Sequence, residues 1–400
     1  MSPDDFLADL IPPNFFQDIQ GQKAAILKTV PLNNFITFGW NELNQILRSQ
    51  RLSSPRFRLV HESPEITNAR PYNAEIGRRG VEITRVNVTR LHEFLRAGAT
   101  LILDAIDEAD DTLQSLTTAF ARRFGSLPQT NLYVSFGDKR GFGLHWDDHD
   151  VFVIQLDGSK DWRVYEPTRK FPLFRDAESN DRPPSSDLLY LERKLVPGDV
   201  LYVPRGHWHD VIGVGTRSMH LTVGITHPTP LDILRWTAEK LTRFEDMRMD
   251  LIIEGKDGDY LATREAIIRE RIADMLHKGF LTDFASYRRS NLRYVGDPSL
   301  PFGVEGDLIS RFEFTIEWTH TGTVQILDTG EVLLCAGGKE MTLSAQAADA
   351  INLIRASHRL TKTEYLAALP ENLPSEQAEQ LLHSICELGA CSIRDIKLLV

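Results

Sequence analysis

Three polar residues, His145, Asp147 and His209, have the residue types and the spacing of a metal site. His145 and Asp147 form an H-x-D pair at the start of an apolar run, 151–156, and His209 lies in a later segment. Side chains alternate between the two faces of a strand, so the pair is expected on one face, where a neighbouring strand can add the second histidine. Two histidines and one carboxylate on one side of a metal, with the other positions open, are the ligand set of non-haem Fe(II) oxygenases. The open positions would bind a co-substrate and O₂ directly.

The segment around His209 carries a second pattern. Residues 198–209 (GDVLYVPRGHWH) agree with the second cupin motif, G-x5-P-x-G-x2-H, at each of its fixed positions, while Gly213 stands where the motif ends in Asn. The run at 151–156 is too apolar for an exposed edge strand, and polar groups beside it are costly to bury without a partner. Both observations favour a metal site over a chance H-x-D pair.

Two further histidines compete for the metal. His149 shares the face of His145 and Asp147 in a regular strand, and His207 shares that of His209. A tetrahedral zinc site that includes them is therefore an alternative. Otherwise both are polar side chains that line the mouth of a wet cavity, with His207 as a substrate contact.

The sequence resembles the JmjC-type, 2-oxoglutarate-dependent ribosomal oxygenases of the cupin superfamily. The resemblance is specific in four stretches and extends more loosely over the whole chain: 131–133, 141–148, 151–165 and 204–209. It implies that His145, Asp147 and His209 bind Fe(II), that 2-oxoglutarate is the co-substrate, and that O₂ is consumed.

The resemblance also implies residues that hold the co-substrate. A dicarboxylate that chelates the metal at one end needs a cation at the other, and Lys160, after a predicted turn, is the candidate. On the residues alone, a solvated turn lysine is the default interpretation of Lys160. Tyr133 and Asn131 share one strand face and, with Thr222 on the last strand, are candidates to donate hydrogen bonds to the co-substrate. His220 shares the face of Thr222, although a core histidine is the more common role.

Composition limits the class of protein. A chain of 400 residues, 42% hydrophobic and 25% charged, predicts a globular protein of two or three domains. No stretch reaches the roughly 18 apolar residues of a membrane span, and the first residues, MSPDD, are acidic where a signal peptide is basic. Cys335, Cys386 and Cys391 fit neither a disulfide framework nor a zinc site. We expect a cytoplasmic protein with no membrane partner.

The first region, 1–228, is predicted to be the JmjC (cupin) catalytic domain with an N-terminal α/β extension. Residues 130–227 are rich in strand-like segments separated by Gly and Pro, typical of a double-stranded β-helix, or jelly roll. The fold class is thus mainly β with α. Before them, periodicity predicts helices at 40–49, 91–96 and 112–124 and strands at 57–60 and 100–103.

The second region, 229–295, has a helical period. Apolar residues recur every three or four positions over 231–244 and 261–275, which predicts two amphipathic helices. On the pattern alone, packing on the barrel and pairing with another subunit are equally plausible. The resemblance favours a helical dimerisation region and hence a homodimer.

The third region, 296–400, has a hairpin-like pair at 323–327 and 331–334 and helical segments at 345–355 and 375–388. The resemblance implies a winged-helix domain. The region carries 7 Lys and Arg against 15 Asp and Glu, a net of −8. Phosphate would repel such a surface, so we expect no DNA binding and a protein-contact or structural module.

The function implied is an Fe(II)- and 2-oxoglutarate-dependent protein hydroxylase that acts on an Arg or His side chain of a ribosomal protein. The net charge of −11 suits a basic polypeptide, although solubility explains it equally well. Alternatives are a hydroxylase of a peptide or peptidyl natural-product intermediate and a non-catalytic, metal-binding cupin. Lysine demethylation is less favoured because no histone-reader module is recognisable.

Overall fold

The computed structural model describes residues 3–29, 36–61, 72–76, 80, 82–176, 181–291, 299–301, 308–319, 322–371 and 373–399. They form two compact units, Met1–His227 and Pro228–Val400, and each unit has a hydrophobic core of its own. No helix in the described residues is long and apolar enough to cross a membrane.

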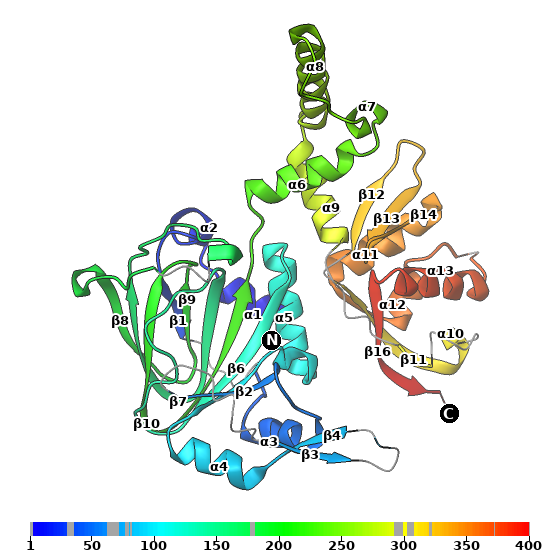
Figure 1. Ribbon diagram of the computed structural model, residues 1–400. Coiled ribbons are helices and arrows are strands. Elements are labelled where there is room, and N and C mark those ends of the chain that lie inside the picture. The colour runs from blue at the N-terminus through cyan, green and yellow to red at the C-terminus, as the bar shows by residue number, and fades with distance from the viewer. Residues whose placement is uncertain are drawn as a thin grey trace. The chain divides into compact units, whose positions relative to one another are not determined.

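The first unit is built on an eight-stranded antiparallel sheet (Figure 1). Its strands lie side by side in the order β1 (Ala25–Thr29), β9 (Asp199–Val203), β7 (Asp150–Tyr165), β10 (Trp208–Ile225), β6 (Pro128–Ser135), β5 (Thr100–Leu103) and β2 (Phe57–Val60), and β8 (Leu189–Leu195) pairs with β7. The long strands β7 and β10 pair with each other, with register shifts between Val214 and His220. Such bulges bend a sheet, so both strands contribute to the two halves of the barrel wall.

Helices cover this sheet on the outside. They are α1 (Pro3–Leu10), α2 (Phe15–Asp18), α3 (Trp40–Ser49), α4 (Val88–Arg96) and α5 (Asp111–Phe124), with a separate hairpin of β3 (Tyr72–Ile76) and β4 (Glu82–Val86). Helix α5 begins where the Asp110 carboxylate accepts the Leu113 N–H, and it ends at Gly125, whose φ of 58° only glycine adopts freely. Its Phe120 packs on Phe152 of β7 in the main core. The helix predicted at 40–49 and the strands predicted at 57–60 and 100–103 are confirmed.

Two predicted positions along β7 were wrong. The H-x-D pair does not lie on the strand, because β7 begins only at Asp150 and His145 and Asp147 belong to the loop before it. Lys160 does not follow a turn, because β7 runs unbroken through it. Gly158, with a φ of 63°, lies where the strand bulges, and a Cβ there would collide with the Arg217 carbonyl. The Gly-Ser pair therefore marks a bend in one strand rather than the end of it.

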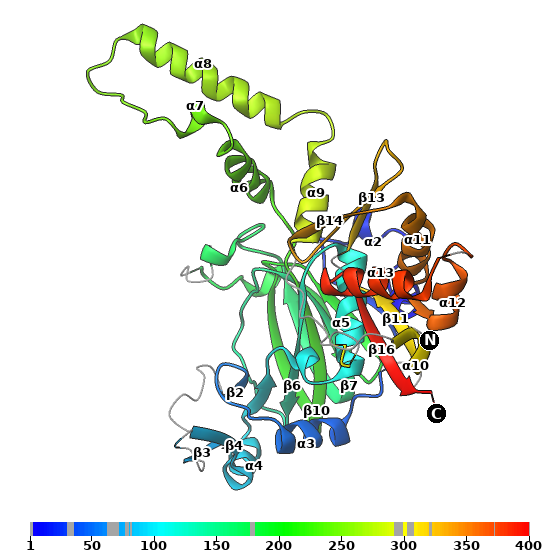
Figure 2. The same ribbon diagram turned by 90° about the vertical axis from the view of Figure 1, so that its right-hand side faces the viewer.

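The second unit starts with four helices. These are α6 (Pro230–Leu241), α7 (Glu245–Arg248), α8 (Gly258–Met275) and α9 (Phe280–Ser290). The Trp236 ring of α6 packs against Phe284 and Tyr287 of α9. Helix α8 contains no buried residue and stands apart from the sheets of its unit (Figure 2). Helices are present at both predicted segments, but α8 has no buried face, so its predicted amphipathic character is not confirmed.

The remainder of the second unit combines two three-stranded sheets with helices. One sheet has the order β15 (Arg359–Thr361), β11 (Phe312–Trp318), β16 (Cys391–Leu398), and the other β12 (Thr323–Ile326), β13 (Val332–Ala336), β14 (Lys339–Leu343). The helices are α10 (Leu308–Arg311), α11 (Ala348–Ser357), α12 (Lys362–Ala367) and α13 (Ser375–Glu387). Trp318, Tyr365 and Leu382 lie in its core. The predicted hairpin is β12–β13, and the two predicted helices are α11 and α13.

Candidate active site

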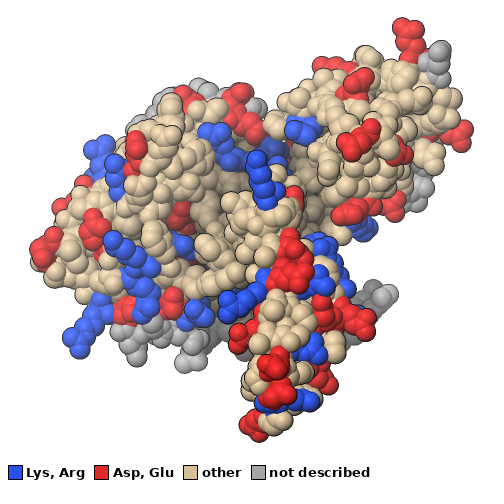
Figure 3. Space-filling model, turned by 90° about the horizontal axis from the view of Figure 1, so that it is seen from above, with Lys and Arg blue, Asp and Glu red and all other residues tan. Residues whose placement is uncertain are grey.

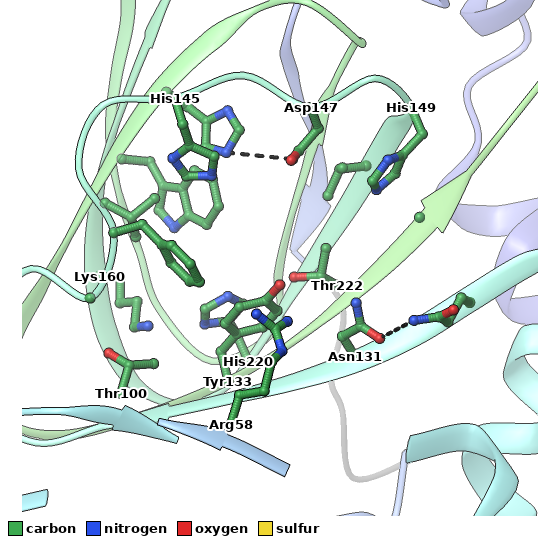
Figure 4. Close-up of a pocket in the computed structure, with 18 of the residues that line it drawn as sticks. Arg58, Thr100, Asn131, Tyr133, His145, Asp147, His149, Lys160, His220 and Thr222 are labelled. Atoms are coloured by element: carbon green, nitrogen blue, oxygen red, sulfur yellow. Dashed lines mark hydrogen bonds and ion pairs between the residues drawn. The ribbon is translucent and has the colours of Figure 1, made fainter. Parts of the chain in front are cut away.

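The side chains of His145, Asp147 and His209 converge at one end of a cavity in the first unit. One possible ligand atom from each lies within 4.8 Å of the others, and the two imidazole centroids are 4.2 Å apart. The backbones of His145 and His209 exchange two hydrogen bonds, of 3.2 and 2.7 Å, which join the loop to the start of β10. The loop thus places the pair where a strand was predicted to place it (Figure 4).

Backbone carbonyls orient both imidazole rings. The Nδ1 of His145 lies 2.8 Å from the Gly143 carbonyl, and the Nδ1 of His209 lies 3.2 Å from the His207 carbonyl. Donation of Nδ1–H to these oxygens leaves each Nε2 with a lone pair directed to the shared centre. The Nε2 of His209 lies 3.7 Å from a carboxylate oxygen of Asp147, too far for a hydrogen bond but suitable for two ligands of one ion.

The protonation states of this group also suit a metal. Burial raises the pKa of the Asp147 carboxyl, but the neighbouring imidazoles of His209 and His145 lower it by more, so the net shift is downward. Burial lowers the pKa of His209 to about 4. At neutral pH the group therefore offers neutral imidazole and ionised carboxylate, the forms that bind a metal. Two imidazoles and one carboxylate fit Fe(II), and a metal held by these three ligands would have further positions for other ligands.

Gly206 of the second cupin motif secures the loop. Its N–H donates to the Asp147 carbonyl at 2.8 Å. Its φ is 81°, and a Cβ there would lie 2.7 Å from Cδ of Pro172. A larger residue would strain the turn and push it from the neighbouring loop, so glycine is needed for the metal-site geometry.

The cavity has a volume of about 500 Å³, within the usual range of small-molecule sites. Lys160 lies at the end away from the metal group, near Thr100 (Figure 4). Only 5% of Lys160 is exposed, and its ammonium makes no hydrogen bond or ion pair with a described residue. Burial lowers its pKa to about 7. A buried cation without a counter-charge is unfavourable unless an anion completes it.

The other predicted co-substrate residues also line this cavity. Tyr133 of β6 stacks on His220 of β10 with ring centroids 4.9 Å apart, and Thr222 lies two residues further along β10. Burial, and then the charge of Lys160, lowers the pKa of His220 well below its usual value, so that ring is neutral. Asn131 Oδ1 accepts the Ala105 N–H at 3.0 Å and the Gln129 amide at 2.8 Å. The Asn131 amide nitrogen is thereby directed to the cavity (Figure 4).

Sequence reasoning missed Arg58 and Thr100, which reach the same cavity from β2 and β5. Arg58 donates to both carboxylate oxygens of Asp104, at 2.6 and 2.8 Å. The sequence signal that could have identified Arg58 was a single arginine inside the otherwise apolar strand Phe57–Val60. Its charge is already paired, so Lys160 is the better site for an added anion.

The competing histidines do not join the metal group. His207 precedes β10, does not line the cavity and packs against the edge of the Tyr190 ring. His149 lines the cavity but lies outside the converging set. Within the described residues, the alternative zinc site and the proposed substrate contact of His207 therefore find no support.

Comparison with known proteins identifies a domain. Residues 104–233 match the family model of the JmjC domain, a range that includes all three converging residues. Ribosomal oxygenase 1 from Bos taurus is 36% identical over 132 residues, 32% of this chain and 20% of that protein. Ribosomal oxygenase 2 from Mus musculus is 35% identical over 135 residues, 33% of this chain and 28% of that protein. The bifunctional lysine-specific demethylase and histidyl-hydroxylase NO66 from Brugia malayi is 28% identical over 167 residues, 40% of this chain and 24% of that protein.

The matched part thus spans about a quarter of the length of these relatives. A solved structure is similar over nearly the whole chain. The Escherichia coli ribosomal oxygenase YcfD superposes with a TM-score of 0.62 at 17% identity, covering 96% of this chain and 98% of that one. The same protein in complex with cobalt and 2-oxoglutarate gives a TM-score of 0.58, again at 17% identity, covering 95% of this chain and 97% of that one. At this identity the similarity shows the fold, a mainly β, cupin-type JmjC architecture with helices.

Proposed function

Because residues 104–233 form a JmjC domain, we propose that this protein is an Fe(II)- and 2-oxoglutarate-dependent protein hydroxylase. The observation that carries the proposal is one cavity with His145, Asp147 and His209 at one end and Lys160 at the other, which is buried and has no partner in the part of the chain that the structure describes. A 2-oxoacid can chelate a metal, and a second carboxylate on the same molecule needs a cation further along. A ligand of this kind accounts both for the converging metal ligands at one end of the cavity and for the buried ammonium at the other.

Each side chain has a defined task. His145, Asp147 and His209 hold the iron on one side, and the bound iron supplies the oxidising chemistry that attacks an unactivated C–H bond. Lys160 receives the distal carboxylate of 2-oxoglutarate, while Asn131, Tyr133 and Thr222 donate hydrogen bonds to the co-substrate. Trp162, stacked on His209 with centroids 5.7 Å apart, excludes water from that side of the metal.

For the substrate we propose an Arg or His side chain of a ribosomal protein or another basic polypeptide, in the cytoplasm. The names of two relatives, ribosomal oxygenase 1 and ribosomal oxygenase 2, support a ribosomal target, and the net charge of −11 is compatible with a basic one. A peptide or peptidyl natural-product intermediate is the second candidate. Mass spectrometry of ribosomal proteins from wild-type and deletion cells tests the first, since a lost increment of about 16 Da identifies the target, whereas unchanged masses favour the second.

The catalytic claim has a direct test. Purified protein should convert 2-oxoglutarate to succinate only when both Fe(II) and O₂ are supplied. Formation of succinate in the absence of iron would contradict the proposal. Absence of turnover together with tight metal binding would indicate a non-catalytic, metal-binding cupin.

We also propose that residues 229–295 form a dimerisation region. Helix α8 has 18 residues and buries none of them, although most of the stability of helices in proteins comes from packing of an apolar face. Exposed apolar side chains gather on these helices and on the loop between α7 and α8: Leu231, Leu234, Leu251, Ile252, Ile253, Ile268 and Ile272. A second copy of the chain would cover them. Leu241 belongs to the apolar repeat of 231–244, but only 7% of it is exposed, so it supports the fold of its own unit and not a contact between subunits.

For residues 296–400 we propose a winged-helix-like module that contacts protein rather than DNA. Helices α11–α13 and the β12–β13 hairpin support this class. Basic side chains are interspersed with acidic ones among the described residues on the face shown in Figure 3. A net charge of −8 in this region opposes binding to phosphate.

A further inference from the structure

We infer that Asp150 is a positioning residue for the metal site: its carboxylate fixes the turn that holds the ligand Asp147, without being a ligand itself. The inference rests on the proposed function, because it takes His145, Asp147 and His209 as the ligands of the metal. It goes beyond that function by assigning a role to the third aspartate of the segment 147–150, which the proposed chemistry does not use.

Asp150 is the first residue of β7 and is buried, with 3% of its surface exposed. It does not line the cavity, and it lies outside the converging set of ligands. Both oxygens of its carboxylate accept hydrogen bonds. Oδ1 accepts the Arg205 N–H at 2.9 Å, and Oδ2 accepts the Tyr202 hydroxyl at 2.7 Å. The carboxylate therefore joins segments of the protein rather than binding the metal.

The Arg205 N–H belongs to a tight turn formed by residues 204–207. The His207 N–H donates to the Pro204 carbonyl at 3.2 Å, and Gly206 has a φ of 81°, a combination that is typical of a type II turn. The hydrogen bond that closes the turn does not use the N–H groups of its two central residues. Both groups can therefore donate to other segments.

The two central N–H groups link Asp150 to a metal ligand. Arg205 donates to the Asp150 carboxylate, and Gly206 donates to the Asp147 carbonyl at 2.8 Å. After the turn the chain enters β10, whose second residue is the ligand His209. One turn thus contacts the loop that carries Asp147 and leads directly to His209. A carboxylate that fixes this turn also fixes the two ligands relative to each other.

The other partner of the carboxylate, Tyr202, is anchored in the main core. Its ring packs on Phe15 and on Phe152, with ring centroids 5.0 Å apart in both pairs. Its hydroxyl oxygen also accepts the Gly21 N–H at 2.8 Å. The hydroxyl that donates to Asp150 therefore has little freedom to move, and the carboxylate is held from the side of the core.

The Asp150 carboxyl is ionised at neutral pH. Burial raises its pKa, but the contacts with His227, the Arg205 N–H and the Tyr202 hydroxyl lower it by more, so the net shift is downward. Hydrogen bonds to an ionised acceptor are shorter and stronger than those between neutral groups. The Arg205 N–H therefore has a strong acceptor, and loss of that acceptor would free the turn to shift relative to the loop.

Two substitutions at Arg205 test the hydrogen bond while Asp150 stays in place. Proline is favoured at the second position of a type II turn, so Arg205→Pro removes the N–H and keeps the turn. The dissociation constant for Co(II), measured by absorption titration of the full chain, should rise about 10- to 100-fold, the usual range for groups that orient a metal ligand. Arg205→Ala keeps the N–H and loses only the side chain over the Phe171 ring, so it should bind Co(II) more tightly than Arg205→Pro.

A second set of variants separates positioning from general stability. Asp199, at the start of β9, is the matched control, because it is also a buried aspartate whose carboxylate accepts a backbone N–H, that of Val196, at 3.1 Å. Asp150→Ala and Asp199→Ala should both lower the melting temperature. Only Asp150→Ala should weaken Co(II) binding and alter the Co(II) spectrum. Asp150→Asn, whose amide oxygen can still accept the Arg205 N–H, should bind Co(II) more tightly than Asp150→Ala.

Wild-type affinity for Co(II) in Arg205→Pro and Asp150→Ala would overturn the inference. An equal loss in Asp199→Ala would also overturn it, because the effect would then be one of stability. An equal loss in Asp150→Asn would assign the effect to charge, with the same consequence. If Asp150→Ala does not fold, Tyr202→Phe takes its place and should weaken Co(II) binding in the same direction. Failure of the wild-type protein to bind Co(II) would overturn the proposed function instead.

Discussion

The cavity of the first unit and helix α8 of the second depart from ordinary burial in opposite directions. In the cavity, Lys160, Trp162 and His220 bury nitrogen atoms that have no hydrogen-bond partner among the described residues. On α8, apolar side chains such as Ile268 and Ile272 face solvent. Each arrangement is unfavourable in the isolated chain, and each is relieved by a different partner. A buried polar group needs a small, charged ligand, whereas an exposed apolar stripe needs another protein surface.

Loss of a metal ligand should have the largest effect in the cavity. We expect His145→Ala or Asp147→Ala to abolish iron-dependent formation of succinate. Loss of one of three ligands would lower the affinity for iron and would open a coordination position that the protein normally fills. His92→Leu, an exposed histidine on α4, is the matched control and should be fully active. Activity in both ligand variants would indicate that His149 binds the metal and would refute the proposed ligand set.

The corresponding change on the helices is Leu234→Glu, at a residue that is 55% exposed on α6. Burial of a leucine contributes about 1.5–3 kcal/mol, and a symmetric dimer buries it twice. The dissociation constant should therefore rise at least about a hundredfold, as measured by analytical ultracentrifugation.

Two substitutions control that experiment. Ile326→Glu changes an equally exposed residue on β12 and should leave the dimer intact. Leu241→Glu introduces a charge at a buried position and should lower the melting temperature. If the wild-type protein sediments as a monomer, the proposed dimer is wrong, and no second copy covers the apolar side chains of α8.

At the far end of the cavity, Lys160→Ala should raise the KM for 2-oxoglutarate about 10- to 150-fold. This range corresponds to roughly 1.5–3 kcal/mol for a hydrogen bond to a charged group. Metal affinity should change little, because Lys160 lies away from the converging ligands. An unaltered KM would mean that Lys160 does not bind the distal carboxylate of 2-oxoglutarate. Arg58 would then be the next candidate for that role.

The pH dependence should show a smaller effect of the same lysine. Burial lowers the pKa of Lys160 to about 7, so the ammonium is present below pH 7 and lost as the pH rises. Affinity for 2-oxoglutarate should therefore fall by about tenfold per pH unit above 7, as measured by calorimetry with Mn(II)-loaded protein. The other groups at this end do not titrate there: His220 is held neutral, burial raises the pKa of Tyr133, and Arg58 is paired with Asp104.

Lys160→Arg is the matched variant for this measurement, because a guanidinium stays charged over the whole range. It should bind 2-oxoglutarate with a flat pH profile if the lysine is the titrating group. The same slope in Lys160→Arg would assign the pH dependence to another residue.

The sequence predicted much of the lining of the cavity. The H-x-D pair and the motif ending at His209 follow from local spacing, whereas the resemblance to the JmjC oxygenases implied Lys160, Tyr133, Asn131 and Thr222, and all these residues line one cavity. Strand parity is a local property, which explains why it correctly grouped Asn131 with Tyr133 and His220 with Thr222 on the inward faces of β6 and β10. Helix period likewise predicted α6 and α8 before any contact was known.

Only the tertiary structure decided which histidines converge and which charges stay unpaired. His145 and Asp147 lie in a loop held by Gly206 and β10, so strand alternation gave the right pair for the wrong reason. Arg58 has a partner and Lys160 has none among the described residues, a difference set by side chains from distant strands. Spacing along a chain fixes which face a residue occupies, but burial and pairing depend on contacts between segments far apart in sequence.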